Sequence, residues 1–464
     1  MNHAIYKLAV DHESLRSHRA HISITVPIDM NVFEAPEGYG GAPLFIQYLS
    51  DFHAIDTLGV SLPVTVQGAC VTVATPKSTG NSLTLTYTYN VPQSKAGEID
   101  LSLPTLDALH GRFDNNLTFL APKNRADLSA QLVISAPAEI RVVSSWGGNT
   151  IQNVETIKKL VGGMIVLGNY RISQRTVRDH SVVFAARGDY DEELLKQQFV
   201  KVLESQCDIT GSFPSPRLLG VFQNSVVDCC KGTSLTNGFV VNIPSGTKLD
   251  PLNFEVIGTI SHELFHQWNA MQVIPADEEG AYLLTEGFTN YFAVAALVRA
   301  ELIPPERFAR FLWRYRKLLE NNPRYPGSDF SAMNSGFTSK DDDLSGLAYQ
   351  KGPFVAVLLD RALREDTAGI ESVTSWFRSL MKRYQGSSGY HVDDLRALTV
   401  ELSGKVDGKA LQEFDRAFLG GEALDLDELF SWLGIRCDDQ GNCELTPLPL
   451  PRAEWRRKLF SAQP

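Results

Sequence analysis

The fold is decided by the stretch Ser261-His262-Glu263-Leu264-Phe265-His266-Gln267-Trp268-Asn269, which contains the pattern His-Glu-x-x-His. On a helix, residues four positions apart lie on one face, so His262 and His266 can both offer an imidazole nitrogen to one metal ion. Glu263 leaves the helix beside that face. This position suits a base that takes a proton from a water molecule next to the metal.

The residues before this stretch favour a helix. Asp250 and Pro251 are typical of a helix start, and apolar residues recur at three- and four-residue spacing from 254 to 264. Two histidines at this spacing can also be buried core residues without a metal. The choice between the two interpretations depends on motifs further along the chain.

Glu286 is the candidate third ligand. It lies in the stretch Thr285-Glu286-Gly287-Phe288-Thr289-Asn290-Tyr291-Phe292, which begins a second apolar segment. The residues from 267 to 285 leave room for a loop and a second helix that brings Glu286 to the metal. Two imidazoles and one carboxylate leave the fourth position of a tetrahedral zinc open, as a catalytic site requires. Asn290, one turn later, either holds a ligating histidine by its other ring nitrogen or is an exposed helix residue.

Another apolar helix is expected to begin at Tyr349-Gln350-Lys351-Gly352. Taken alone, this tyrosine would be read as a core residue. Taken together, however, the three motifs resemble the glycyl aminopeptidase family of gluzincin metallopeptidases, distant relatives of aminopeptidase N and leukotriene hydrolase. The resemblance covers roughly 250 to 435. About 30 residues follow Gly434, so the C-terminal PDZ module that many relatives carry is not expected here.

The resemblance implies a thermolysin-like zincin fold, one Zn²⁺ per chain, and a zinc aminopeptidase acting on short peptides. Glu263 would be the general base, and Tyr349 would donate its hydroxyl to the developing oxyanion. It also implies that a peptide lies along the strand just before the metal helix, as an added edge strand.

The region expected to bind the substrate amine departs from the family pattern. It corresponds to Gly232, Thr233, Ser234 and Gly238, but no Asp or Glu occurs between Asp228 and Asp250 to pair with an ammonium group. The run 277–279 is either a replacement anchor or a solvated loop. An alternative function therefore stays open, namely a zinc enzyme of this fold that acts on a non-peptide or amine-blocked small molecule.

Length, charge and cysteine content indicate the general class of this protein. The chain has 464 residues, too many for one core, and 21% are charged, with a net charge of −11. This charge argues against nucleic acid or an anionic membrane as partner. No secretory signal or membrane span is recognised, which predicts a cytoplasmic protein. Six cysteines fit that location, so Cys437 and Cys443 are expected to be free thiols rather than a disulfide or half of a metal site.

The pattern along the chain predicts an α+β multidomain fold. Residues 1–175 alternate apolar and polar residues in strands such as 21–26, 82–89 and 132–135, indicating an N-terminal β-sandwich or saddle. The thermolysin-like catalytic domain is expected over 176–325, an α-helical part over 326–436, and a tail over 437–464. The acidic run 341–343 is interpreted as a solvated loop.

Overall fold

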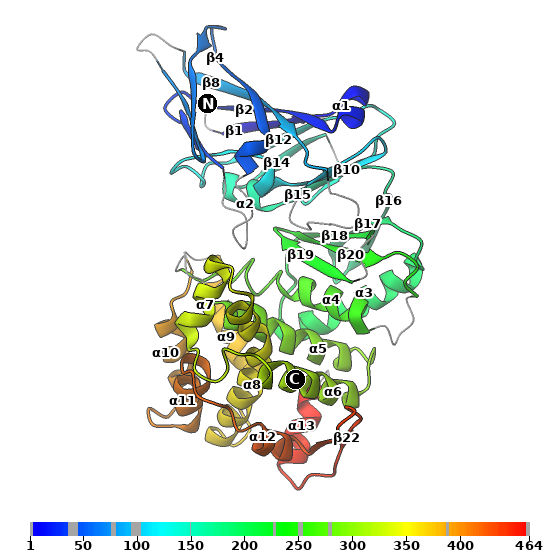
Figure 1. The fold of residues 1–464 in the computed structure, drawn as a ribbon, viewed down its shortest axis with the longest axis vertical. Helices are drawn as coiled ribbons and strands as arrows, with labels where there is room; N and C mark the ends of the chain where they lie inside the picture. Colours follow the sequence, from blue (N-terminus) through cyan, green and yellow to red (C-terminus); the bar gives the residue numbers. More distant parts are fainter. Residues whose placement is uncertain are drawn as a thin grey trace. The chain divides into compact units, whose positions relative to one another are not determined.

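The computed structural model describes residues 3–35, 45–75, 80–93, 104–148, 150–225, 229–248, 254–276, 281–386 and 389–460 (Figure 1). The chain divides into two compact units. The first comprises Met1–Tyr190 and Ser215–Thr247, and the second comprises Asp191–Pro214 and Lys248–Pro464. The predicted helix start at 250–251 and the acidic run 277–279 lie outside the described residues.

The first unit is built from β-sheets, as predicted for the N-terminal part of the chain. Its largest sheet has seven strands in the order β14-β12-β1-β2-β8-β4-β5, in which β1 runs parallel to β12 and antiparallel to β2. Two four-stranded sheets have the orders β13-β15-β10-β9 and β11-β3-β7-β6. The strands are β1 (Ala4–Ala9), β2 (Arg19–Pro27), β3 (Val32–Glu34), β4 (Leu49–Asp56), β5 (Ser61–Leu62), β6 (Val64–Gln67), β7 (Cys70–Val73), β8 (Ser82–Asn90), β9 (Thr105–Leu106), β10 (His110–Asp114), β11 (Ala121–Pro122), β12 (Ala130–Ser135), β13 (Val142–Ser144), β14 (Ile151–Val154) and β15 (Met164–Gly168).

The alternation of residues explains why these strands form. In β2, every second residue from Ala20 to Val26 is buried, while His21 is exposed and Ser23 and Thr25 are partly exposed. Alternate side chains of a strand point to opposite faces, so this pattern gives the sheet one core face. The strands predicted at 21–26, 82–89 and 132–135 are confirmed as β2, β8 and β12. The short helices α1 (His12–Ser17) and α2 (Ile157–Gly162) belong to the same unit.

A five-stranded sheet completes the first unit, in the order β16-β17-β18-β20-β19. Its strands are β16 (Arg171–Val177), β17 (His180–Arg187), β18 (Arg217–Ser225), β19 (Lys231–Leu235) and β20 (Gly238–Pro244). The expectation that the strand just before the metal helix is an edge strand is wrong. A two-residue turn at Thr236-Asn237, where Asn237 has φ 58°, folds β19 back antiparallel on β20 and makes β19 the edge.

The second unit is mainly helical. In its core α4 packs on α5 (Figure 1). Helix α8 packs on the π-helix η4. Its elements are α3 (Glu192–Thr210), α4 (Phe254–Phe265), η4 (Leu283–Phe288), α5 (Thr289–Arg299), α6 (Pro305–Glu320), α7 (Phe330–Ser339), α8 (Asp342–Asp366), α9 (Val373–Tyr384), α10 (Val392–Ser403), α11 (Lys409–Glu413), the π-helix η5 (Phe414–Leu419), α12 (Leu426–Leu433), the hairpin β21 (Ile435–Cys437) and β22 (Cys443–Leu445), and α13 (Arg452–Phe460).

Helix α8 begins at Asp342, earlier than the sequence motif at Tyr349 predicts. The side chain of Asp341 accepts hydrogen bonds from the backbone N–H groups of Asp343 and Leu344, which makes Asp341 the N-cap. Asp342 and Asp343 lie in the first turn, where negative charge is favourable. The interpretation of 341–343 as a solvated loop is therefore wrong, and Tyr349 lies in the second turn of α8 rather than at its start.

The two cysteines near the C-terminus form a disulfide, so the expectation of two free thiols is wrong. Cys437 and Cys443 are directly opposite each other in the β21–β22 hairpin, with their Cα atoms 4.1 Å apart. The hairpin register thus brings the sulfurs together. In the part of the chain that the structure describes, no helix is both long and apolar enough to cross a membrane.

Candidate metal centre

Helix α4 is fixed in the second unit by a buried serine. Ser261 is fully buried, its hydroxyl donates to the carbonyl of Ala293 on α5 at 2.8 Å, and Gln206 on α3 donates to the Ser261 carbonyl at 2.7 Å. Because Ser261 directly precedes His262, these hydrogen bonds set the position of the first metal-binding residue relative to both neighbouring helices.

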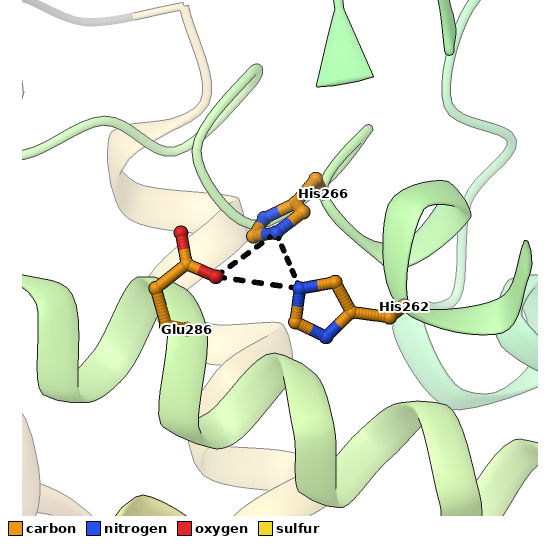
Figure 2. A group of neighbouring side chains, drawn as sticks. All are labelled: His262, His266 and Glu286. Atoms are coloured by element: carbon orange, nitrogen blue, oxygen red, sulfur yellow. Dashed lines mark hydrogen bonds and ion pairs between the residues drawn. The ribbon is translucent and has the colours of Figure 1, made fainter. Parts of the chain in front are cut away.

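The three predicted metal ligands lie together (Figure 2). His262 comes from the last turn of α4, and His266 follows directly after that helix ends. Their Nε2 atoms are 3.0 Å apart, and each is 3.3 Å from Oε2 of Glu286. One ligand atom from each residue falls within 4.8 Å of the others. The structure therefore assembles the group that the motif spacing predicts.

Glu286 lies on η4, a π-helical segment that leads directly into α5. Segments of π-helix are rare and occur often at functional sites, because the wider turn redirects a side chain. Next to Glu286, Gly287 lies against Gly352 of α8, and a Cβ atom on Gly287 would be 2.5 Å from the Gly352 Cα. The two glycines thus allow η4 and α8 to approach closely, which brings Glu286 near the motif of Tyr349.

Each histidine has a partner for its other ring nitrogen. Nδ1 of His262 is 2.9 Å from Oδ1 of Asn290, and Nδ1 of His266 is 3.1 Å from the carbonyl oxygen of Asn269. Both partners accept hydrogen bonds, so each Nδ1 carries a proton and Nε2 is the ring nitrogen left to bind a metal. Of the two interpretations of Asn290, this geometry favours the one in which it holds a ligating histidine. Asn269 was not singled out from the sequence, although it ends the quoted motif.

The charges of the site are strongly coupled. Burial alone would lower the pKa of His266, but the carboxylates of Glu286 and Glu263 outweigh burial and raise it to about 9. For Glu286, burial would raise the pKa, but the two imidazoles outweigh it and hold the pKa below its ordinary value. His266 and Glu286 thus stabilise each other as opposite charges, and a divalent cation placed between them would take over the role of the proton.

The two predicted catalytic residues flank this group. Glu263 is buried, and its charge acts on both His266 and Tyr349. The ring of Tyr349 lies nearly parallel to that of His262, with centroids 6.3 Å apart. Burial, followed by the charges of Glu286 and Glu263, raises the pKa of Tyr349 well above its ordinary value. Its hydroxyl is therefore protonated at neutral pH and can donate a hydrogen bond.

The donor set fits a zinc ion. Two imidazole nitrogens and one carboxylate oxygen are the ligands of catalytic zinc sites, and ligands bound at about 2.0–2.1 Å in a tetrahedron lie about 3.3 Å apart. The separations of 3.0, 3.3 and 3.3 Å among these three atoms match that requirement.

The residues predicted to bind the substrate lie in the first unit. Gly232, Thr233 and Ser234 are on the edge strand β19, and Gly238 begins β20. Their role in substrate binding stays a prediction. Asp277, Glu278 and Glu279, the alternative anchor, are outside the described residues.

The fold is similar to that of solved metallopeptidases. An aminopeptidase N family protein from Idiomarina loihiensis matches with a TM-score of 0.78 and 19% identity, over 93% of this chain and 78% of that one. The M1 zinc metallopeptidase from Deinococcus radiodurans matches with a TM-score of 0.60 and 15% identity, over 91% and 94% of the two chains. A mutant of the Deinococcus enzyme, solved with a Tyr-Ser-Ala substrate, has a TM-score of 0.59 and 15% identity, over 92% and 95% of the two chains.

The fold, the His-His-Glu group and these neighbours support a zinc metallopeptidase, as the motifs predict. Within that class, the family model of the M61 glycyl aminopeptidases matches residues 255–340, the segment that contains all three candidate ligands. The predicted resemblance to gluzincin aminopeptidases is thereby confirmed. No curated protein sequence matches the chain.

Proposed function

We propose that the protein is a zinc-dependent aminopeptidase that removes N-terminal residues from short peptides. The observation that supports this proposal most is the convergence of His262, His266 and Glu286, with Glu263 and Tyr349 beside them. A non-catalytic protein has no chemical need for the last two residues.

In this proposal His262, His266 and Glu286 hold one zinc ion per chain. When bound, zinc supplies Lewis-acid chemistry, because it lowers the pKa of a water molecule and polarises a carbonyl group. Asn290 and the carbonyl of Asn269 orient the two imidazoles, so that both Nε2 atoms face the same point.

Glu263 and Tyr349 carry the proton chemistry. The Glu263 carboxylate takes a proton from the attacking water and later passes it to the leaving amine. Tyr349 keeps its hydroxyl proton at neutral pH and donates a hydrogen bond to the oxyanion that forms from the scissile carbonyl.

The proposed substrate is a peptide with a free N-terminal amine. The match to the M61 glycyl aminopeptidase model and the structural similarity to an aminopeptidase N family protein favour this substrate. One observation favours a second candidate, because the segment from 229 to 249 contains no Asp or Glu to pair with an ammonium group. That candidate is a zinc enzyme that acts on an amine-blocked or non-peptide small molecule.

The test compares matched peptide amides with free and acetylated N-termini, incubated with the zinc-loaded protein. Cleavage of the free-amine set alone supports an aminopeptidase. Cleavage of the acetylated set shows that no free amine is required and rejects that assignment. If neither set is cleaved while zinc is bound at one per chain, the small-molecule candidate is favoured.

Glu263→Gln is the matched blank, because it has nearly the same shape as the wild-type residue but cannot accept a proton. We expect it to bind zinc as the wild type does and to lose most of the rate, by a factor of about 10² or more. Equal activity in the variant and the wild type would refute the proposed role of Glu263.

A further inference from the structure

Asn269 makes contacts on both sides of the candidate metal centre. It is fully buried, and its backbone carbonyl accepts the hydrogen bond from Nδ1 of His266 at 3.1 Å. Its side-chain Nδ2 donates to the carbonyl of Leu284 at 2.8 Å and to the hydroxyl of Thr289 at 3.0 Å. The backbone of Asn269 thus contacts the second histidine. Its side chain contacts both the π-helix η4 and the start of α5.

These two acceptors of the amide lie on either side of the third ligand, and the carbonyl of Thr285, at 3.5 Å, is a third acceptor. Leu284 is two residues before Glu286, and Thr289 is three residues after it. His266 follows the end of α4, whereas Glu286 lies on η4, 20 residues further along the chain. The Asn269 amide therefore supplies a direct hydrogen-bonded connection from the turn that carries His266 to the segment that carries Glu286.

The backbone around Asn269 is held in an unusual conformation. Ala270, the next residue, has φ 104°, a region that non-glycine residues rarely adopt. Such a conformation persists only where surrounding contacts determine it. Here the N–H of Ala270 donates to the Val273 carbonyl and the N–H of Met271 donates to the His266 carbonyl, both at 3.1 Å. The turn is thus fixed on the side of His266 as well as through the amide.

We propose that Asn269 is a positioning residue of the metal centre, whose amide sets the distance between His266 and Glu286. The inference rests on the proposed zinc site and adds a residue to it. A metal gains full affinity only where its ligands are already at the correct separation, and contacts that orient ligands contribute about 10- to 100-fold to affinity.

The test is the zinc affinity of Asn269→Leu, measured by competition with a chromophoric chelator, together with the visible spectrum of the cobalt-loaded protein. Leucine has a similar shape, adds no charge, and leaves the backbone carbonyl of residue 269 in place. The matched control is Asn115→Leu. Asn115 is also fully buried in the first unit, and its amide also donates to a carbonyl, that of Leu160 at 2.8 Å.

We expect Asn269→Leu to bind zinc about 10- to 100-fold more weakly and to alter the cobalt spectrum. Asn115→Leu should lower thermal stability with zinc affinity unchanged. If both variants bind zinc as the wild type does, Asn269 is only a structural residue and the inference is wrong. If the wild type itself binds no zinc, the proposed function fails first, which is a different result.

A second pair of variants keeps the test decisive if Asn269→Leu does not fold. Thr289→Val removes one acceptor of the amide, whereas Thr289→Ser retains the hydroxyl. We expect weaker zinc binding in the valine variant and wild-type affinity in the serine variant. Equal affinity in the two would overturn the inference.

Discussion

Replacing Gly287 by alanine should disturb the metal centre without removing any of its ligands. The added Cβ would lie 2.5 Å from Cα of Gly352 and 2.6 Å from the carbonyl oxygen of Ala348, both backbone atoms of α8. Non-bonded carbon atoms rest about 3.5 Å apart, so η4 and α8 would have to separate by about 1 Å. Overpacking of this kind costs about 1–3 kcal/mol of stability. Since Glu286 and Tyr349 lie on the two displaced segments, we expect kcat/KM to fall by about 10²-fold.

The assay is hydrolysis of the best substrate by the zinc-loaded variant, combined with urea unfolding. Gly258→Ala is the matched control, because Gly258 lies on the metal helix α4 itself and its added Cβ meets nothing closer than 3.8 Å. There alanine should raise stability by about 0.5–1 kcal/mol and leave activity unchanged. The reasoning is refuted if Gly287→Ala is as stable and as active as Gly258→Ala.

Three further predictions concern the same unit. Burial, then Arg416, lowers the pKa of Lys351 from the ordinary 10.5 to about 8; between these pH values the unfolded chain holds the proton that the folded chain has released, so stability rises with pH. Between pH 8 and 10.5, the free energy of unfolding of the wild type should rise by at most about 3 kcal/mol relative to that of Lys351→Met, as measured by urea unfolding. A difference between the two proteins that stays constant over this pH range would contradict the prediction. Asn290→Ala should weaken zinc binding about 10- to 100-fold, because Nδ1 of the ligating His262 loses its acceptor, and unchanged affinity in a chelator competition would argue against its role. Glu286→Ala should abolish stoichiometric zinc binding in a calorimetric titration, and retention of one zinc per chain would exclude it as a ligand.

The assembly of the metal-binding group could be predicted because its signal is local. His262 and His266 are related by helix periodicity, and the spacing to Glu286 is long enough for one loop. The contribution of Asn269 could not be read in the same way, because it depends on a turn with an unusual backbone and on acceptors near Glu286. Nor does the sequence show that Gly287 and Gly352 lie against each other, since each glycine alone is compatible with an ordinary helix.

The errors in the fold have physical reasons of the same kind. The family resemblance alone implies that the strand before the metal helix is an edge strand, whereas the turn at Thr236-Asn237 adds β19 outside it. The charge of the acidic run at 341–343 favours a solvated loop, whereas Asp341 is a helix cap. For Cys437 and Cys443, only the hairpin register shows that the two sulfurs can meet.

The path of the chain through the two units limits how the protein can be divided. Residues 191–214 belong to the second unit, although the chain then returns to the first before entering α4. A C-terminal fragment starting at 248 would contain every candidate ligand but would lack α3, and with it the hydrogen bond from Gln206 to Ser261. A fragment that keeps both the candidate ligands and this contact therefore cannot be obtained by one truncation. It would have to be engineered by joining 191–214 to the C-terminal part through a new linker.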